Sequence, residues 1–230
     1  MTDALQQQIA YYRARAGEYD EWFYRKGRYD RGQVMNQRWF DEAEQVMQAL
    51  HNQPKVAHVT ELACGTGIWT EHLLKIGENI TALDASEEML ALNAEKLQSE
   101  RVTYEQADLF AWQPQPDSTD MIFFSFWLSH VPPEKLDAFL QTVATALKPG
   151  GRIFMLDSRR VDSSTAHDHI IPDAGETLTR KLNDGSEYQI YKIFYEPVAL
   201  QNAFLRVGLR VAVTITPTFF IYAAGEKTSS

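Results

Sequence analysis

The strongest constraint in this sequence is a regular alternation of short apolar runs and helical segments between residues 56 and 157. Strands that alternate with helices in this way form a parallel sheet with helices on both faces. We therefore expect an α/β protein with a doubly wound sheet. The expected strands of this part are VAHVTEL (56–62), ENITALD (78–84), VTYEQ (102–106), DMIFFSF (120–126) and RIFMLD (152–157).

The C-terminal part of the sequence has a different pattern. Two apolar runs, 209–216 and 218–224, follow a helical segment and have no room for a crossover helix between them. They must therefore pair antiparallel. Together with the five earlier strands they predict a seven-stranded sheet, mostly parallel, with a C-terminal antiparallel hairpin. A separate inserted β-hairpin is predicted around the turn residues Asn183, Asp184 and Gly185.

The first forty residues form a distinct segment. They hold seven basic side chains against five acids, and nine of the chain's 27 aromatic residues. Apolar residues at spacings of three and four predict a helix over 4–23, with Gly17 as the point where it would break, and a second helix over 37–50. We interpret this segment as a helical cap or lid.

A chain of 230 residues fits one domain with additional elements better than two independent domains. We expect a single unit over 1–230, divided into an N-terminal cap (1–35), a core (36–157), an inserted loop and hairpin (158–195) and a C-terminal helix with a strand pair (196–230).

The net charge and the composition limit the classes of partner that we expect for this chain. A net charge of −9 argues against a nucleic-acid binder, which needs a broad basic face. One cysteine, Cys64, excludes an internal disulfide framework and a cysteine-cluster zinc site. The longest apolar stretch (121–128) is far shorter than the ~20 residues that span a bilayer, and the N-terminus has no apolar export segment. We expect a cytoplasmic protein without membrane or nucleic-acid partners, as a monomer or a homodimer.

A glycine-rich turn, ELACGTG (61–67), lies between the first expected strand and a helix. Small residues there let the backbone approach a ligand closely. Asp84 ends the next strand 19 residues after Gly65, which is the spacing at which an acid bonds both hydroxyls of an adenosine ribose. The combination of strand, turn, helix and acid predicts a site for an adenosine-containing ligand.

Two ligand classes compete for this turn, dinucleotides and S-adenosylmethionine. The dinucleotide fingerprint needs a third small residue three positions after Gly67, where this chain has Thr70 preceded by Trp69. The Glu61 carboxylate would repel a pyrophosphate, whereas it would suit an ammonium or sulfonium group. S-adenosylmethionine is therefore favoured over a nicotinamide or flavin cofactor.

The ordered motifs ELACGTG, ALDAS, QADLF, DMIFFSFWLSHVP and LKPGGRIFMLD resemble those of the class I S-adenosylmethionine-dependent methyltransferases. The chain is most similar to the ubiquinone/menaquinone-biosynthesis-like group, which contains many small-molecule methyltransferases. The resemblance covers about residues 56–157, and YYRARAGEYDEWF resembles the cap helix of that group more loosely. It implies a Rossmann-like fold and S-adenosyl-L-methionine as cofactor.

The resemblance also implies roles for individual residues. The turn would line the methionine part of the cofactor, Asp84 would hold the ribose, Asp108 would accept a bond from the adenine amino group, and the end of the fourth strand would lie near the methyl group. The cofactor-binding residues that we predict are Tyr19, Glu61, Ala63, Gly65, Gly67, Asp84, Ala85, Met89, Asp108, Leu109, Ser125 and Phe126.

The acceptor is expected to be a small, partly apolar or aromatic molecule, methylated on O, N or C. His130 is the candidate for a general base or for orienting the acceptor, with a structural histidine as the alternative. Metal-free transfer is expected, because Ser125 stands where metal-dependent members carry aspartate and no third ligand accompanies His167 and His169. The predicted substrate pocket consists of Tyr11, Trp22, Tyr24, Arg28, Tyr188, Tyr191 and Tyr195.

Other functions stay open at this stage. The same scaffold can direct attack on a different carbon of the sulfonium, even intramolecularly, and release methylthioadenosine. A non-catalytic cofactor-binding protein is another reading of the same residues. A nicotinamide-dependent oxidoreductase is the least favoured.

Overall fold

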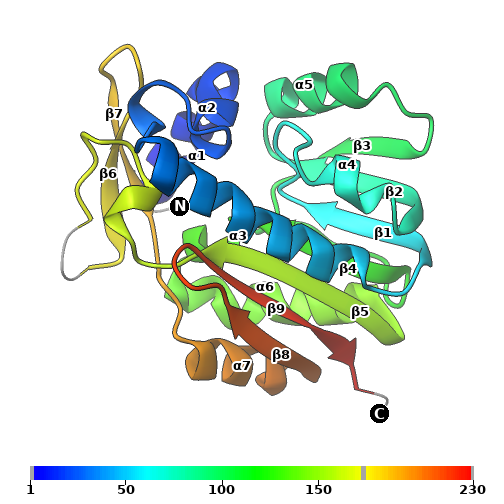
Figure 1. Cartoon of the computed structure of the whole chain (residues 1–230). Helices are drawn as coiled ribbons and strands as arrows, with labels where there is room; N and C mark the ends of the chain where they lie inside the picture. Colours follow the sequence, from blue (N-terminus) through cyan, green and yellow to red (C-terminus); the bar gives the residue numbers. More distant parts are fainter. Residues whose placement is uncertain (1–2, 172–174, 229–230) are drawn as a thin grey trace.

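The computed structural model describes residues 3–171 and 175–228 and contains a seven-stranded sheet with the order β3-β2-β1-β4-β5-β9-β8 (Figure 1). β1 to β5 run parallel, β9 is antiparallel to β5, and β8 is antiparallel to β9. This confirms the predicted α/β class and its C-terminal antiparallel hairpin. The strands are β1 (Val56–Leu62), β2 (Gly77–Asp84), β3 (Val102–Gln106), β4 (Thr119–Ser125), β5 (Leu147–Ser158), β8 (Leu209–Ile215) and β9 (Phe220–Lys227).

Helices cover both faces of the sheet. One face packs against three of them and the other face against two, and β4 alternates between the two layers. Phe123 belongs to the first layer and Phe124 to the second, and both are fully buried. This explains why β4 reads as an unbroken apolar run. The first layer contains α3 (Gln33–His51), α4 (Thr70–Leu73) and α5 (Glu87–Leu97), and the second contains α6 (Pro133–Ala146) and α7 (Pro197–Arg206).

The N-terminal helix is interrupted at the place expected from Gly17. α1 (Asp3–Ala14) passes into a 3₁₀ turn, η1 (Ala16–Glu18), before α2 (Tyr19–Phe23) begins. The helix expected after the glycine-rich turn is only four residues long, α4, and β2 already begins at Gly77. A Cβ at Gly77 would lie 2.7 Å from the side chains of Val59 and Ile80, so only glycine fits that place in the sheet.

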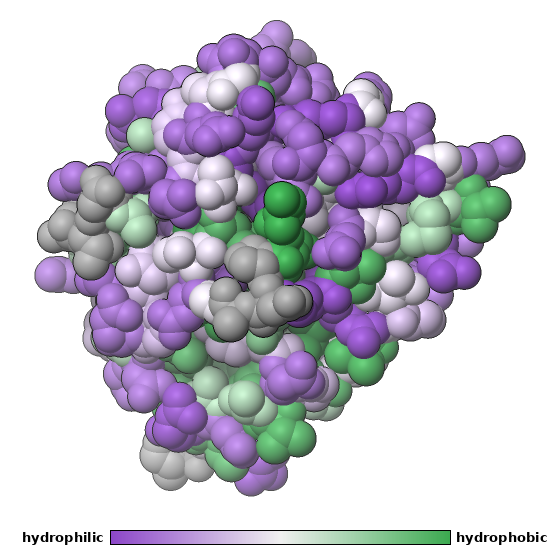
Figure 2. All heavy atoms as spheres, turned by 90° about the vertical axis from the view of Figure 1, so that its left-hand side faces the viewer, coloured by the Kyte–Doolittle hydropathy of each residue, from purple (hydrophilic) through white to green (hydrophobic). Residues whose placement is uncertain are grey.

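The cap and the inserted hairpin lie side by side near one end of the parallel strands (Figure 1). The hairpin is a two-stranded antiparallel sheet of β6 (Thr177–Lys181) and β7 (Glu187–Tyr191). α1 packs along β7, where the side-chain oxygens of Gln7 and Gln8 accept bonds from the backbone N–H groups of Gln189 and Tyr191 at 2.9 and 3.0 Å. The surface on this side is mainly hydrophilic, with small apolar spots (Figure 2).

The buried carboxylate of Glu42 joins α3 to the turn between β8 and β9. Its Oε2 accepts hydrogen bonds from the backbone N–H groups of Thr218 and Phe219 at 3.0 and 2.7 Å, and from the hydroxyl of Thr216 at 2.5 Å. Because these donors have few alternatives inside the protein, the carboxylate fixes the turn that ends the sheet.

We expect Glu42→Ala to lower the free energy of unfolding by about 2–4 kcal/mol, because it leaves several buried donors without an acceptor. Glu44→Ala is the matched control, since Glu44 lies exposed on the same helix. Urea unfolding followed by circular dichroism measures both. Equal stability of the two variants would contradict this role of Glu42.

Candidate active site

The turn after β1 contains three residues with positive φ: Ala63 (53°), Gly65 (53°) and Gly67 (84°). The two glycines are needed for different reasons. A Cβ on Gly65 would meet only the Tyr19 ring, at 4.0 Å, so this position faces open space. A Cβ on Gly67 would lie 2.5 Å from Oδ1 of Asn93, so this position faces packed protein.

Asn93, which the sequence analysis did not identify, supports the turn from beneath. It is fully buried on α5, and its Nδ2 donates to the Thr70 hydroxyl at 2.9 Å and to the Gly65 carbonyl at 3.4 Å. Its Oδ1 accepts from the Tyr104 hydroxyl at 3.0 Å. The available signal was a polar residue at a position where the buried face of this helix calls for an apolar one.

Glu61 also lies beneath the turn and lines none of the cavities described below. Its Oε2 accepts a hydrogen bond from the Thr70 hydroxyl at 2.6 Å, and burial raises its pKa to about 8. Burial therefore disfavours the charged form of this carboxyl group. The Glu61 side chain contacts Thr70 beneath the turn and does not reach the cavity.

Asp84 ends β2 and presents its carboxylate at the edge of the sheet. Oδ2 accepts from the Gly65 N–H and Oδ1 accepts from the Ser86 N–H, both at 2.9 Å. Burial raises the pKa of Asp84, while the backbone N–H groups lower it. These bonds orient the carboxylate and connect it to the glycine-rich turn.

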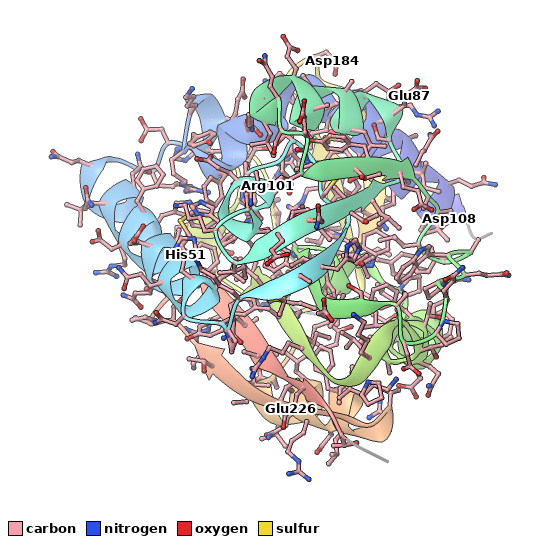
Figure 3. The ribbon with its side chains drawn as sticks, turned by 90° about the vertical axis from the view of Figure 1, so that its right-hand side faces the viewer. His51, Glu87, Arg101, Asp108, Asp184 and Glu226 are labelled. Carbon is pink, nitrogen blue, oxygen red and sulfur yellow. The ribbon has the colours of Figure 1, made fainter. Side chains whose placement is uncertain are left out.

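A cavity of about 420 Å³ lies over the carboxyl ends of β1, β2 and β4. α1 forms its other side with Leu5, Gln8, Ile9, Tyr12 and Arg13. Asp108, on the loop after β3, also lines it, and its place in the molecule is marked in Figure 3. Of the predicted cofactor-binding residues, those on the cavity wall are Tyr19, Ala63, Gly65, Asp84, Ala85, Met89, Asp108, Leu109, Ser125 and Phe126.

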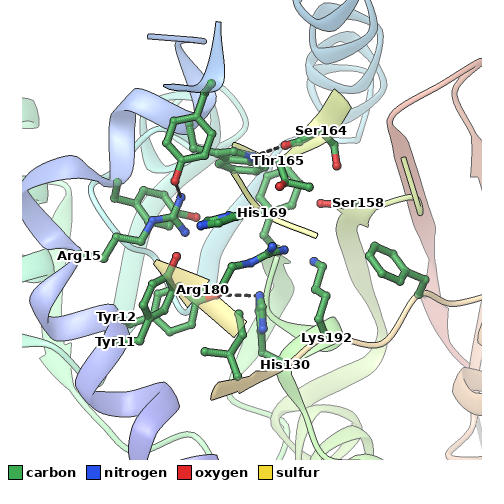
Figure 4. Close-up of a pocket in the computed structure, with 16 residues that line it drawn as sticks. Tyr11, Tyr12, Arg15, His130, Ser158, Ser164, Thr165, His169, Arg180 and Lys192 are labelled. Carbon is green, nitrogen blue, oxygen red and sulfur yellow. Dashed lines mark hydrogen bonds between the residues drawn. The ribbon is translucent and has the colours of Figure 1, made fainter. Parts of the chain in front are cut away.

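A second cavity of about 60 Å³ lies next to the first and is strongly cationic (Figure 4). Three cationic residues line it: Arg15 on the loop after α1, Arg180 on β6, and Lys192, which directly follows β7. Hydroxyl groups and histidines add to its polar lining: Tyr11, Tyr12, Tyr19, Tyr29, Ser158, Ser164, Thr165, His130 and His169.

The positive charges of this second cavity are only partly compensated. Lys192 Nζ lies 3.1 Å from Oδ1 of the buried Asp157 and donates to the Ser129 hydroxyl at 2.7 Å. Among the described residues, no carboxylate lies within ion-pair distance of Arg15 or Arg180. Nη1 of Arg180 and Nε of Arg15 are buried without a hydrogen-bond partner. Such groups are costly unless an anion reaches them.

Aromatic rings hold Arg15 in place. Its guanidinium carbon lies 4.8 Å from the centre of the Tyr19 ring, 5.5 Å from Tyr11 and 5.9 Å from Tyr29. Each contact contributes on the order of 1 kcal/mol when desolvated. The tyrosines of the cap therefore orient a cation toward the small cavity.

His130 lines both cavities, and both of its ring nitrogens are engaged. Nδ1 lies 2.6 Å from the Tyr191 carbonyl, so it carries the proton, and Nε2 lies 2.7 Å from the Tyr12 hydroxyl, from which it accepts. Burial lowers the pKa of His130 well below its usual value. This arrangement favours an orienting role over that of a base.

Two of the predicted substrate-pocket residues, Tyr11 and Trp22, line the small cavity. The other five line neither cavity. Tyr24 is exposed on the surface, and Arg28 is bound to Glu18, Asp168 and the Lys181 carbonyl. The remaining three have contacts outside the cavity walls: Tyr188 with the Tyr11 ring, Tyr191 through its carbonyl to His130, and Tyr195 with the Leu128 carbonyl.

Two features are absent from residues 3–171 and 175–228. No three His, Cys, Asp or Glu side chains there come together in a way that could hold a metal ion. No helix there is long and apolar enough to cross a membrane. His167 and His169 contact backbone groups of Asp30 and Lys181.

Comparisons with known proteins agree with this geometry. Residues 59–151 match the methyltransferase domain family. The protein chain of a DhpI–SAM–HEP complex is 31% identical in sequence to this chain; the alignment covers 98% of both chains, and the TM-score is 0.80. The protein chain of a DhpI–SAH complex is 30% identical; the alignment covers 99% of this chain and 98% of that one, and the TM-score is 0.79. The chain belongs to the class I S-adenosylmethionine-dependent methyltransferases.

A curated relative of this methyltransferase is the ubiquinone biosynthesis O-methyltransferase of Xanthomonas euvesicatoria. It is 29% identical over 160 residues, which is 67% of this chain but only 63% of the relative. The match therefore covers less than two thirds of that protein.

The large cavity of this methyltransferase fits S-adenosylmethionine, the cofactor of the family. It is roomy enough for a nucleoside with an amino-acid tail, and its wall at Gly65 has space that a Cβ would fill. The oriented carboxylate of Asp84 lies on the same wall. Backbone, carboxylate and apolar side chains together match the chemistry of such a ligand.

We expect Gly67→Ala to destabilise the methyltransferase by about 2–4 kcal/mol, because it combines a left-handed backbone with overpacking against Asn93. Gly17→Ala is the matched control, since nothing lies within 4 Å of a Cβ there. Thermal unfolding compares the two. A loss as large in Gly17→Ala, or none in Gly67→Ala, would refute the steric argument.

Proposed function

We propose that this methyltransferase transfers the methyl group of S-adenosylmethionine to an oxygen of a small oxyanion. The observation that carries the proposal is the convergence of Arg15, Arg180 and Lys192 in a small cavity that adjoins the cofactor cavity. One buried acid, Asp157, pairs with Lys192, so the excess positive charge matches an anionic ligand. This acceptor differs from the apolar or aromatic molecule expected from the sequence, because the aromatic rings surround Arg15.

The size of the small cavity supports methylation of the anionic group itself. The small cavity, at about 60 Å³, is much smaller than the cofactor cavity of about 420 Å³, so a compact acceptor suits it better than a second nucleoside-sized molecule. Four residues line both cavities: Tyr12, Tyr19, Phe126 and His130. An anionic group bound by Arg15, Arg180 and Lys192 would therefore lie next to the cavity that holds the cofactor.

The similarity to the DhpI–SAM–HEP complex supports a two-ligand arrangement, because that complex contains a second ligand together with SAM. The name of the Xanthomonas relative describes an O-methyltransferase. Both are consistent with transfer to oxygen on this scaffold.

In this proposal the chain holds the cofactor at the carboxyl edge of the sheet. Asp84 would bind the ribose, the backbone near Ala63 and Gly65 the methionine part, and the loop carrying Asp108 the adenine. When bound, S-adenosylmethionine supplies a methyl group on a positively charged sulfur. α1 covers this side and keeps water away from the reacting groups.

The acceptor needs no base in this scheme, because an oxyanion is already a nucleophile. Arg15, Arg180 and Lys192 bind and align it, and alignment alone can supply most of the rate enhancement. His130 keeps its proton on Nδ1 toward the Tyr191 carbonyl throughout. This fits the lowered pKa of its buried ring.

We expect Asp84→Ala to weaken the binding of S-adenosylhomocysteine at least about tenfold, because a charge-assisted hydrogen bond to the ribose is lost. Calorimetry measures the affinity, and Asp137→Ala on the exposed face of α6 is the control. Unchanged affinity in Asp84→Ala would exclude the ribose role. Binding of NADH but not of S-adenosylhomocysteine would instead revive a dinucleotide enzyme.

The decisive experiment supplies labelled S-adenosylmethionine and a panel of small carboxylates, phosphate monoesters and phosphonates, each beside its neutral analogue, and detects products by mass spectrometry. We expect label only in methyl esters of oxyanions. Arg180→Met should lower kcat/KM by about a hundredfold or more, since an unscreened charge contact is lost, and leave S-adenosylhomocysteine affinity within about twofold.

Arg210→Met, on the exposed face of β8, is the matched control and should keep full activity. Methylation of neutral aromatic molecules would overturn the acceptor assignment. Release of methylthioadenosine without transfer would favour the cyclisation alternative. Binding without any turnover would favour a non-catalytic protein.

A further inference from the structure

A closed ring of hydrogen bonds stands between the two cavities and joins the cap, the core and the hairpin. The Tyr12 hydroxyl on α1 donates to His130 Nε2 at 2.7 Å (Figure 4). His130 Nδ1 donates to the Tyr191 carbonyl at 2.6 Å. Gln8 Nε2 donates to the His130 carbonyl, and Gln8 Oε1 accepts from the Tyr191 N–H, both at 3.0 Å. We call these four residues, Gln8, Tyr12, His130 and Tyr191, the His130 latch.

The elements that the latch joins contribute to both cavities. α1 covers the large cavity with Leu5, Ile9 and Arg13, and the residue just beyond its end, Arg15, lines the small one. The hairpin supplies Arg180 and continues directly into Lys192. A ligand in either cavity therefore favours the same placement of α1 against the hairpin.

Electrostatics oppose that placement until an anion is present. Arg15 belongs to the cap, whereas Arg180 and Lys192 belong to the hairpin, so like charges meet where the two segments close on each other. The positive charges of Arg180 and Arg15 help burial to lower the pKa of Lys192, against the effect of Asp157. An anion bound between them removes the repulsion and draws the cap and hairpin together.

We propose that the His130 latch couples the two cavities, so that an anion in the small cavity strengthens cofactor binding in the large one, and the reverse. His130 and Tyr12 are positioning residues in this proposal, and they act through α1. The inference rests on the proposed anion site and goes beyond it, since an anion could bind beside the cofactor without any coupling. Because coupling is reciprocal, both ligands must change each other's affinity by the same factor.

The test is calorimetric titration of the full chain with S-adenosylhomocysteine, with and without saturating inorganic phosphate, at ionic strength matched with chloride. We expect phosphate to tighten S-adenosylhomocysteine binding about fivefold or more. The reverse titration, phosphate into the complex, should give the same factor. Phosphate affinity should fall at least about tenfold in Arg180→Met.

Tyr12→Phe removes the hydroxyl that bonds His130 and keeps the ring. We expect the coupling factor to fall to near one. Because Tyr12 also lines both cavities, the affinity of each ligand alone is measured in the same variant, and the factor is the ratio of the affinities with and without the other ligand. His130→Gln tests the other partner with a side chain that can keep one bond, and its factor should be intermediate. Tyr24→Phe is the matched control, because Tyr24 belongs to the cap and lines neither cavity.

The outcomes separate the two proposals. If phosphate binds in an Arg180-dependent way and S-adenosylhomocysteine affinity does not change, the coupling is wrong and the anion site stands. If Tyr12→Phe keeps the full coupling factor in a folded protein, the latch is not the coupling element. If phosphate does not bind, or binds equally to Arg180→Met, the anion site fails and the coupling fails with it.

Discussion

The reversal of strand order between β1 and β4 is the constraint on which the rest of this structure depends. β2 and β3 extend the sheet on one side of β1, and β4 and β5 extend it on the other, so the connections diverge at the carboxyl ends of β1 and β4. A crevice forms at such a point in open parallel sheets, and it is where ligands bind. The glycine-rich turn, Asp84 and Ser125 all lie at this edge, and the cap and the hairpin lie over it.

The cofactor half of the site could be predicted from the sequence because it is local. Apart from Tyr19 in the cap and Met89 on α5, the predicted residues end a strand or lie in the loop that follows one, and a strand end determines which edge of the sheet its side chain reaches. Even so, two predicted contacts, Glu61 and Gly67, face the interior, because the turn has its own packing requirements toward Thr70 and Asn93. Sequence spacing identifies the turn, but only the packed structure separates its outer side from its inner side.

The proposed acceptor half could not be predicted in this way, since its residues come from three separate parts of the chain: the cap, the core and the hairpin. Arg15, His130, Arg180 and Lys192 meet only after the cap and the hairpin have packed on the core. A usable signal was present in the hairpin: Arg180 and Lys192 occupy inward positions next to the buried Leu178 and Ile190, where alternation calls for apolar side chains. A charged side chain at an inward strand position does not fit a purely apolar core. Positions where a residue departs from the expected pattern in this way are often functional sites.

Burying these cations also has a consequence for the fold. Trp22 and Phe23 of the cap pack on the core, whereas three tyrosines surround Arg15, whose Nε is buried without a hydrogen-bond partner. A buried cation with an unpartnered polar atom costs free energy, and bonds away from the cations, such as those from Gln7 and Gln8 to β7, offset that cost. Under the proposed function, an anion in the small cavity would remove part of the cost.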